Sequence, residues 1–342
     1  MKNTQVIQLM SIVRLSIFML GITMMSCNSK KEQQLPAIGK SVALFDYFSY
    51  KGNDDFYISN PLSGEDYFYN PILPGWYSDP SVCTNGEGDY FLVTSTFTYF
   101  PGVPIFHSKD LVNWKQIGHV LNRASQLVNM EGQKVSGGIF APAISYNPYN
   151  KTYYMVTTNV GAGNFFVKMQ DPFGEWSEPV MLPEVGGIDP SFFFDEDGKA
   201  YIVNNDEAPD NKPEYSGHRT IRIQEFDVKT DKTIGPRKIL VNKGAQPADK
   251  PIWIEGPHLY KINGKYFLMS AEGGTGNWHS EVIFRGDSPM GKFLPWKNNP
   301  ILTQRHLNSD RPNSVTCAGH ADLIQTKEGD WWAVFLARSE EH

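Results

Sequence analysis

Three short segments, far apart in the 342-residue sequence, each place one carboxylate among small, rigid and aromatic residues. The segments are Trp76–Ser81, Gly187–Ser191 and Trp253–His258, and their acids are Asp79, Asp189 and Glu255. A carboxylate in apolar surroundings is costly unless it has a partner or a chemical task, because desolvation disfavours its charged form. For any one segment, a turn begun by Asp before Pro explains the pattern equally well. Together, the three segments predict a shared acidic site.

Hydrolysis of a glycosidic bond is one reaction that such a site could perform. It needs a carboxylic acid to protonate the leaving oxygen and a carboxylate that attacks carbon or activates water. The proton donor needs a raised pKa, which apolar surroundings or a neighbouring negative charge can supply. Glu255 has apolar neighbours in the sequence, and Asp189 held near it would add repulsion while itself staying ionised. Asp79 is then left as the base.

The elements that would position these acids read as β-strands. Short runs rich in Tyr, Phe, Val and Ile recur from residue 70 onward between clusters of Gly, Pro, Asn and Asp. Turns such as Asp197-Gly198 and Asn263-Gly264 predict hairpins. The clearest strands are Tyr90–Thr96, Tyr153–Thr158, Ala200–Asn204, Ile221–Asp227, Lys265–Ala271, Glu281–Arg285 and Trp331–Ala337. No amphipathic stretch suits a βαβ unit, so the pattern predicts an all-β fold.

A loose internal repeat indicates how the strands are arranged. The phrase is a loop, often with Pro, then an apolar strand, a turn that is usually Gly-bearing, and a Tyr- or Trp-rich strand. Its five copies are "DPSVCTNGEGDYFLVTS", "APAISYNPYNKTYYMVTT", "DPSFFFDEDGKAYIVNN", "GPHLYKINGKYFLMSAE" and "GHADLIQTKEGDWWAVFLA". A spacing of roughly 45 to 65 residues suits a four-stranded propeller blade, and a β-sandwich would not repeat one phrase. The repeat predicts a five-bladed β-propeller, with Asp79, Asp189, Glu255 and His320 at equivalent positions that open onto the central channel.

Composition narrows the class of partner. A formal net charge of −6 and a pI near 5.8 give no basic footprint, which argues against nucleic acid. Aromatic residues make up 13% of the chain and offer flat apolar faces with polar handles, which suit sugar rings. No CxxC or HExxH spacing occurs, so neither a structural zinc site nor a zinc protease is indicated.

The N-terminus reads as a targeting segment. Lys2 and Arg14 accompany an apolar run that ends at Ser26-Cys27, which looks like a bacterial lipoprotein signal with Cys27 as the acylated residue. A signal anchor is the rival interpretation, but the run is short for a span of about 20 residues. We therefore expect a signal peptide over 1–27, a tether and N-terminal segment over 28–69, and the propeller over 70–342. This predicts an exported lipoprotein, periplasmic or at the outer membrane, that meets the membrane only through its lipid.

The motifs over about residues 70 to 338 resemble those of glycoside hydrolase family 43, in their order and approximate spacing. They are "DPSV", "STF" with "FPGVPIFHSKDLVNW", "GGIFAP", "IDPSFFFDEDGK", "EGPHLYK", "AEGGT", "NPILT" and "GHADLIQT". The resemblance implies a five-bladed propeller that acts as a β-xylosidase or α-L-arabinofuranosidase on plant-type oligosaccharides, with no required cofactor.

The resemblance also implies roles for particular residues. Asp79 matches the general base, Asp189 the residue that modulates pKa and Glu255 the general acid of an inverting mechanism. Such a mechanism holds the base and acid carboxyl groups about 6.5–9.5 Å apart. His320 matches a central His that touches the sugar, a calcium ion or a water, so calcium in the propeller centre is compatible with the family. Phe97 of "STF" looks like a wall of the subsite for the terminal sugar.

Two departures from the family pattern bear on function. Phe140 of "GGIFAP" lies where xylosidase relatives often carry Trp, which leaves xylosides and arabinosides open as substrates. The sequence also stops at His342, before a "GRET"-like segment whose Arg binds the sugar, and Arg338 is a poor substitute for that Arg. We expect a last blade that is truncated at its C-terminal end. The alternative function is a carbohydrate-binding propeller, derived from such an enzyme, that captures glycans without cleaving them.

Overall fold

The computed structural model describes residues 58–308, 310–312 and 314–339. The chain divides into two units, Met1–Pro61 and Leu62–His342, and all named strands belong to the second. The expected signal peptide at 1–27 and most of the expected tether lie outside the described residues. Within the described ranges, no helix has the length and apolar character needed to cross a membrane.

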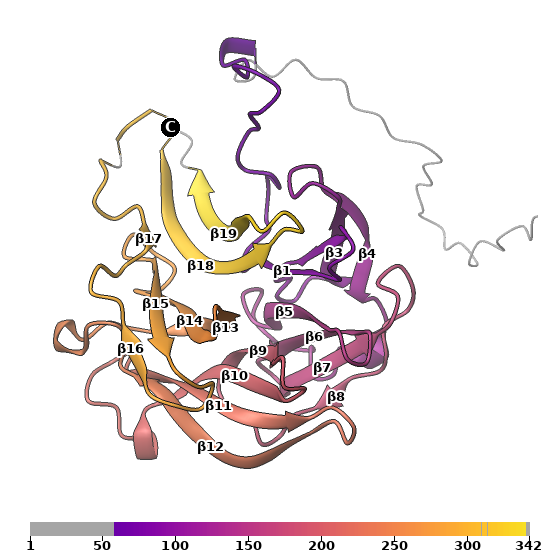
Figure 1. Ribbon diagram of the computed structural model, residues 1–342, viewed down its shortest axis with the longest axis vertical. Coiled ribbons are helices and arrows are strands. Elements are labelled where there is room, and N and C mark those ends of the chain that lie inside the picture. The colour runs from indigo at the N-terminus through magenta and orange to yellow at the C-terminus, as the bar shows by residue number, and fades with distance from the viewer. Residues whose placement is uncertain (1–57, 309, 313, 340–342) are drawn as a thin grey trace, which may run out of the picture. The chain divides into compact units, whose positions relative to one another are not determined.

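The strands form antiparallel sheets that follow one another in chain order (Figure 1). The first sheet contains β1 (Ser81–Thr84), β2 (Tyr90–Val93), β3 (Gly102–Ser108) and β4 (Lys115–Leu121). The second contains β5 (Ile139–Asn147), β6 (Thr152–Asn159), β7 (Gly163–Met169) and β8 (Val180–Met181). The third contains β9 (Ile188–Phe194), β10 (Ala200–Glu207), β11 (Arg219–Asp227) and β12 (Lys232–Asn242).

The fourth sheet is larger and the last is smaller. The fourth contains β13 (Glu255–Ile262), β14 (Lys265–Glu272), β15 (Ser280–Gly286), β16 (Phe293–Pro295) and β17 (Leu302–Thr303). The last contains β18 (Val315–Gln325) and β19 (Trp331–Ser339). Short 3₁₀ helices occur at Ala124–Gln126, Pro209–Asn211 and Pro247–Asp249.

The sheets surround a common axis, and the first strand of each sheet lies innermost (Figure 1). β1 contacts β5, β5 contacts β9, β9 contacts β13 and β13 contacts β18, and β18 returns to β1. The all-β, propeller-like arrangement is thus confirmed with four blades, and the two-stranded β18–β19 sheet stands in the next place around the axis.

A buried carboxylate joins the last sheet to the first. The hydroxyl of Ser81 donates to Asp322 Oδ2 at 2.7 Å, and the hydroxyl of Tyr260 donates to Asp322 Oδ1 at 2.7 Å. The same Ser81 oxygen accepts a hydrogen bond from the Ile144 backbone N–H at 3.1 Å. Because a buried charge is stable only when it is hydrogen-bonded, Asp322 fixes β1 and β13 relative to β18.

Apolar side chains fill the space between neighbouring sheets. Phe91 of the first sheet and Met155 of the second lie in one buried cluster, and Phe166 and Phe226 join the second sheet to the third. Similar clusters join the third sheet to the fourth, and the first sheet to β18–β19. Burial of these faces drives the sheets together, because removing apolar area from water is the main favourable contribution to folding.

Local turn chemistry explains the hairpins that the sequence predicts. Asn263 and Gly264 link β13 to β14 with φ values of 51° and 72°. Two successive positive φ angles are the mark of a type I′ turn, whose twist matches that of the strands. At the β9–β10 turn, Gly198 has a φ of 84° and its N–H donates to the Asp195 carbonyl at 3.0 Å. Both predicted hairpins are confirmed.

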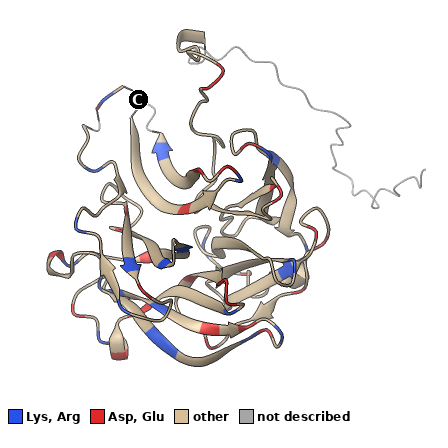
Figure 2. Ribbon diagram, in the orientation of Figure 1, with Lys and Arg blue, Asp and Glu red and all other residues tan. Residues whose placement is uncertain are grey.

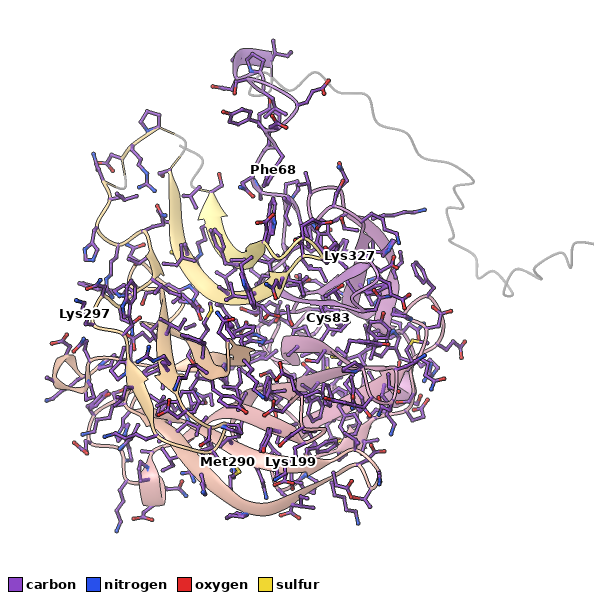
Figure 3. The ribbon with its side chains drawn as sticks, in the orientation of Figure 1. Phe68, Cys83, Lys199, Met290, Lys297 and Lys327 are labelled. Atoms are coloured by element: carbon purple, nitrogen blue, oxygen red, sulfur yellow. The ribbon has the colours of Figure 1, made fainter. Side chains whose placement is uncertain are left out.

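The distribution of charged residues agrees with the absence of a basic footprint in the composition. Figure 2 shows Lys and Arg scattered over several sheets and loops, not gathered in one stripe. Cys83 and Cys317 are both buried and free. Figure 3 shows Cys83 in the interior of the arrangement of sheets.

Each innermost strand from β5 onward carries a bulge at the same point. The register shifts between Phe140 and Ala143, Ile188 and Ser191, Glu255 and His258, and Gly319 and Asp322. The first residue inside each bulge has a positive φ: Ala141 (25°), Asp189 (53°), Gly256 (53°) and His320 (53°). Asp79, just before β1, also has a positive φ (51°). A bulge bends a strand and re-aims its side chains, so the same local geometry recurs where β5, β9, β13 and β18 begin.

This register corrects one sequence-based expectation. Glu255 does not occupy the position of Asp79 and Asp189; it lies one residue earlier, and Gly256 takes the equivalent place. A side chain would not fit there, because a Cβ on Gly256 would lie 2.5 Å from His320 Nε2. The acid is therefore displaced by one residue along the strand.

Candidate active site

The bulged segments meet in a small pocket on the axis. Its lining is Asp79, Pro80, Ser81, Ala141, Pro142, Ala143, Asp189, Pro190, Ser191, Gly256, Pro257, His258 and His320. Three of the residues expected in the channel, Asp79, Asp189 and His320, thus share one cavity. Glu255 adjoins it through Gly256, whose N–H donates to Asp189 Oδ2 at 3.1 Å.

Asp79 is held through both of its carboxylate oxygens. The hydroxyl of Ser95 donates to Oδ2 at 2.6 Å, and His320 Nδ1 lies 3.4 Å from Oδ1. Ser95 is fixed in turn, because its oxygen accepts a hydrogen bond from the Ala141 N–H at 2.8 Å. With 14% of its side chain exposed, the Asp79 carboxylate keeps some access to water. Such an oriented, partly hydrated carboxylate can accept a proton from a water molecule.

Asp189 is held by its backbone and by its side chain. Its N–H donates to Thr158 Oγ1 at 3.1 Å, and the Thr158 hydroxyl donates to Asn164 Oδ1 at 2.6 Å. Burial raises the pKa of Asp189 to about 6; the His320 charge opposes this rise and the Asp79 charge adds to it. A pKa near 6 leaves Asp189 mainly ionised at neutral pH, which is compatible with the expected repulsion of Glu255.

Glu255 opens β13 beside Asp189. Burial raises the pKa of Glu255 well above its ordinary value, and the negative charges of Asp189 and Asp79 raise it further. The positive charge of Arg219 acts in the opposite direction. A carboxyl group in this setting is stabilised in its protonated form, which a proton donor requires.

Arg219 is a site residue that the sequence analysis missed. It begins β11 and forms an ion pair with Glu207 across the β10–β11 register. The preceding Gly217 carbonyl accepts a hydrogen bond from the Trp253 N–H at 2.8 Å, which brings this loop against the segment that leads to Glu255. No local pattern marks Arg219, because it reaches the site only through the packing of the third sheet on the fourth.

The backbone next to His320 is hydrogen-bonded to the buried carboxyl group of Glu281, which the sequence analysis also missed. The Ala321 N–H donates to Glu281 Oε2 at 2.9 Å, while Oε1 of the same carboxyl group has no protein partner. Glu281 is fully buried, and desolvation raises its pKa well above the ordinary value. His320 itself is 6% exposed, so its ring is enclosed on most sides.

Replacing Glu281 by Gln is expected to stabilise the protein increasingly as the pH rises. An unfolded Glu loses its proton near about pH 4.3. The folded protein keeps it to higher pH, so the wild type loses stability as the pH rises through that window. The variant has no such loss, and we expect its Tm to exceed the wild-type Tm by about 2–4 °C at the alkaline end. Melting curves from about pH 5 to pH 8 measure this. The exposed Glu328→Gln is the control, and a Tm difference that stays constant over this range would contradict the assignment.

The two predicted aromatic residues lie together. The rings of Phe97 and Phe140 are 5.8 Å apart at an interplanar angle of 74°, and Trp76 lies 6.0 Å from Phe97. Backbone hydrogen bonds between Phe97 and Ile139 in both directions join the first sheet to the second at this point. Both Phe side chains are only partly buried, and neither is among the residues that line the pocket with Asp79 and Asp189.

The side chains described around the pocket do not form a ligand set suited to calcium. Among the described residues, no group of three or more His, Cys, Asp and Glu side chains is arranged to hold a metal ion. Calcium prefers six to eight oxygen ligands, and His320 offers nitrogen beside the single Asp79 carboxylate. We therefore derive no chemical step through a metal.

Comparison with known proteins defines the family. The model of glycosyl hydrolases family 43 matches residues 68–342. A xylosidase/arabinosidase of Butyrivibrio fibrisolvens is 47% identical over 271 residues, which cover 78% of this chain and 50% of that protein. A non-reducing end α-L-arabinofuranosidase of Bacteroides ovatus is 41% identical over 287 residues, 82% of this chain and 49% of that protein.

Solved structures agree with these matches. A crystal structure of a GH43_12 protein retrieved from a capybara gut metagenome has a TM-score of 0.78 and 52% identity, covering 85% of this chain and 53% of that chain. A xylan β-1,4-xylosidase of Bacillus halodurans has a TM-score of 0.71 and 35% identity, covering 80% and 51%. The chain spans about half the length of the curated relatives it matches. With this site and these matches, the chain belongs to glycosyl hydrolase family 43.

Proposed function

We propose that the protein is a glycoside hydrolase that releases terminal β-xylosyl or α-L-arabinofuranosyl residues from plant-type oligosaccharides. The observation that carries this proposal is the meeting of Asp79, Asp189 and Glu255 around one pocket of a family 43 chain. Relatives whose names specify xylosidase and arabinosidase activity support the choice of sugars.

The proposed mechanism inverts the anomeric carbon in one displacement. Asp79 takes a proton from a water molecule whose oxygen attacks the anomeric carbon, while Glu255 gives its proton to the leaving oxygen as the glycosidic bond breaks. The sugar leaves with the new hydroxyl, Asp79 is protonated and Glu255 is ionised, and exchange with solvent restores both. Asp189 keeps the pKa of Glu255 high before the reaction. The separation between the two carboxyl groups should be about 6.5–9.5 Å.

Three further residues are proposed to bind the terminal sugar. Phe97 and Phe140 offer partly exposed rings at the first and second sheets, and His320 lines the pocket beside Asp79. Flat aromatic rings can pack against the apolar C–H face of a sugar, while an imidazole can form a hydrogen bond with a sugar hydroxyl group.

Charge substitution around Glu255 should move the pH dependence of this activity in two opposite directions. Asp189→Asn removes a negative neighbour and lowers the pKa of Glu255, whereas Arg219→Met removes a positive neighbour and raises it. The basic limb of kcat/KM against pH reports the acid of the free enzyme. We expect this limb at lower pH in the first variant and at higher pH in the second. Shifts of the same sign in both variants would contradict the assignment of Glu255 as the acid.

Features of the whole protein complete the proposal. We propose that it is a five-bladed propeller in which β18–β19 belongs to the fifth blade, and that Cys27 carries a lipid that anchors an exported protein at the periplasmic or outer-membrane surface. Mass spectrometry of the mature N-terminus tests the anchor. Calcium in the propeller centre is compatible with the family, and metal analysis of the purified protein tests it.

The experiment that tests the activity is product analysis on a panel of xylo- and arabino-oligosaccharides. Release of xylose or arabinose from the non-reducing end supports the proposal. Tight binding of the same oligosaccharides without any released sugar would instead support a carbohydrate-binding propeller.

A further inference from the structure

Two tryptophans at the catalytic end of the fourth sheet are unusually exposed. Trp253 is 45% exposed and Trp278 is 68% exposed, although Trp is a residue that normally buries most of its surface. The terminal-sugar residues proposed above do not include either of them. Their position at the Glu255 end of the fourth sheet indicates which part of a substrate they could contact.

Trp253 lies two residues before Glu255 and is held against a glycine turn. A Cβ on Gly274 would come within 2.8 Å of its Cε3 atom, so the indole rests directly on the backbone of that turn. The Gly273 N–H donates to the Ile252 carbonyl at 2.9 Å, which attaches the turn to the loop segment that carries Trp253 and leads into β13. The ring is therefore fixed on this turn, two residues before the acid in the chain, and still exposes almost half of its surface.

Trp278 belongs to the same turn between β14 and β15 and lies near its C-terminal end. A Cβ on Gly273 would lie 2.1 Å from the Trp278 carbonyl oxygen, so the two backbones are in contact. In the fourth sheet Glu255 is opposite Ala271, and Ala271 is opposite Glu281. The turn between β14 and β15, which carries Trp278, thus lies at the same end of the sheet as Glu255.

One side of the Trp278 ring already has a partner. The guanidinium carbon of Arg305 lies 5.9 Å from the ring centroid, a cation–π distance that restrains the indole. Because Trp278 remains 68% exposed, most of its surface is open to a ligand. A restrained, exposed aromatic ring binds at low conformational cost.

We infer that Trp253 and Trp278 form the subsite for the sugar on the leaving-group side of the scissile bond. The inference rests on the proposed function, because Glu255 must touch the leaving oxygen and the sugar attached to that oxygen must lie on the Glu255 side. The ligand class is a neutral pyranose or furanose unit of an oligosaccharide, whose apolar face packs on indole. These residues then set the preference for longer substrates.

The direct test is oligosaccharide binding to the full chain carrying Glu255→Gln, which prevents turnover. Calorimetry with a xylotriose or arabinotriose probe should show Kd rising about 10-fold when Trp253→Ala or Trp278→Ala is added, with the monosaccharide less affected. Trp253→Phe and Trp278→Phe should recover most of the affinity. Trp296→Ala, which removes a 48% exposed Trp after β16 of the same sheet, is the matched control.

A kinetic readout separates this inference from the proposed function. With Glu255 intact, each Trp→Ala variant should lose more kcat/KM on the trisaccharide than on a glycosyl fluoride, whose leaving group is a single atom. Equal losses on both substrates, or an unchanged trisaccharide Kd, would overturn the subsite. Failure of the unaltered chain to hydrolyse any of these glycosides would overturn the proposed function, and the Kd comparison would still decide the subsite.

Discussion

Replacing Glu255 by Gln is expected to lower kcat on oligosaccharides by about 10²- to 10⁴-fold, the usual contribution of a general acid. The amide has no proton of suitable acidity to give to the leaving oxygen. Hydrolysis of a glycosyl fluoride should fall by a much smaller factor, because fluoride leaves with little need for protonation. Steady-state assays on both substrates measure the contrast.

The control for this variant is Glu328→Gln, which makes the same change at an exposed position. Its rates should match those of the wild type on both substrates. An equal loss on fluoride and oligosaccharide in Glu255→Gln would contradict the assignment of Glu255 as the proton donor.

Replacing Asp79 by Asn should lower kcat by about 10³- to 10⁴-fold on both kinds of substrate. The attacking water loses its base whatever the leaving group, so the fluoride offers no rescue. Asn can still accept from Ser95 and remain beside His320, which keeps the local packing. Rate assays on the two substrates, with folding checked by Tm, measure the effect.

The matched control is Asp197→Asn in the exposed β9–β10 turn, which should leave both rates unchanged. A fluoride rate that survives in Asp79→Asn while oligosaccharide hydrolysis fails would assign the acid role to Asp79 instead. Comparing the rates on an oligosaccharide and on a glycosyl fluoride therefore distinguishes the acid role of Glu255 from the base role of Asp79.

Local patterns predicted the strands and hairpins well, because their causes are local. Asn263-Gly264 adopts two positive φ angles with little strain, and the strands around it alternate or continue as apolar runs. β2 is shorter than expected, since the polar residues after Val93 serve other contacts; Ser95 binds Asp79 and Ala141.

The position of Glu255 shows where pattern matching failed. The copies of the repeat begin at Asp79, Asp189 and Gly256, so Pro257 matches Pro80 and Pro190 and Gly256 stands in the acid's place. The expectation that Glu255 is level with Asp79 and Asp189 follows only the acids and departs from this match. The bulge register shows that the prolines carry the structural equivalence.

Residues that support the acids from another sheet could not be found in the sequence. Thr158 binds the Asp189 backbone from the second sheet, and Glu281 binds the backbone beside His320 from the fourth. Arg219 comes to Glu255 through the packing of the third sheet on the fourth. Each contact depends on how whole sheets pack, and no short spacing encodes that. Ser95, which follows β2 in the same sheet as Asp79, does carry a sequence signal, because it belongs to the "STF" motif.

The most direct test of the account is the anomeric form of the first sugar released, followed by proton NMR during hydrolysis of a β-xyloside. Asp79 and Glu255 acting on opposite faces of the ring predict that α-xylose appears first and β-xylose grows in only by mutarotation. Initial release of β-xylose would require a covalent intermediate and would contradict the roles given to these two carboxylates.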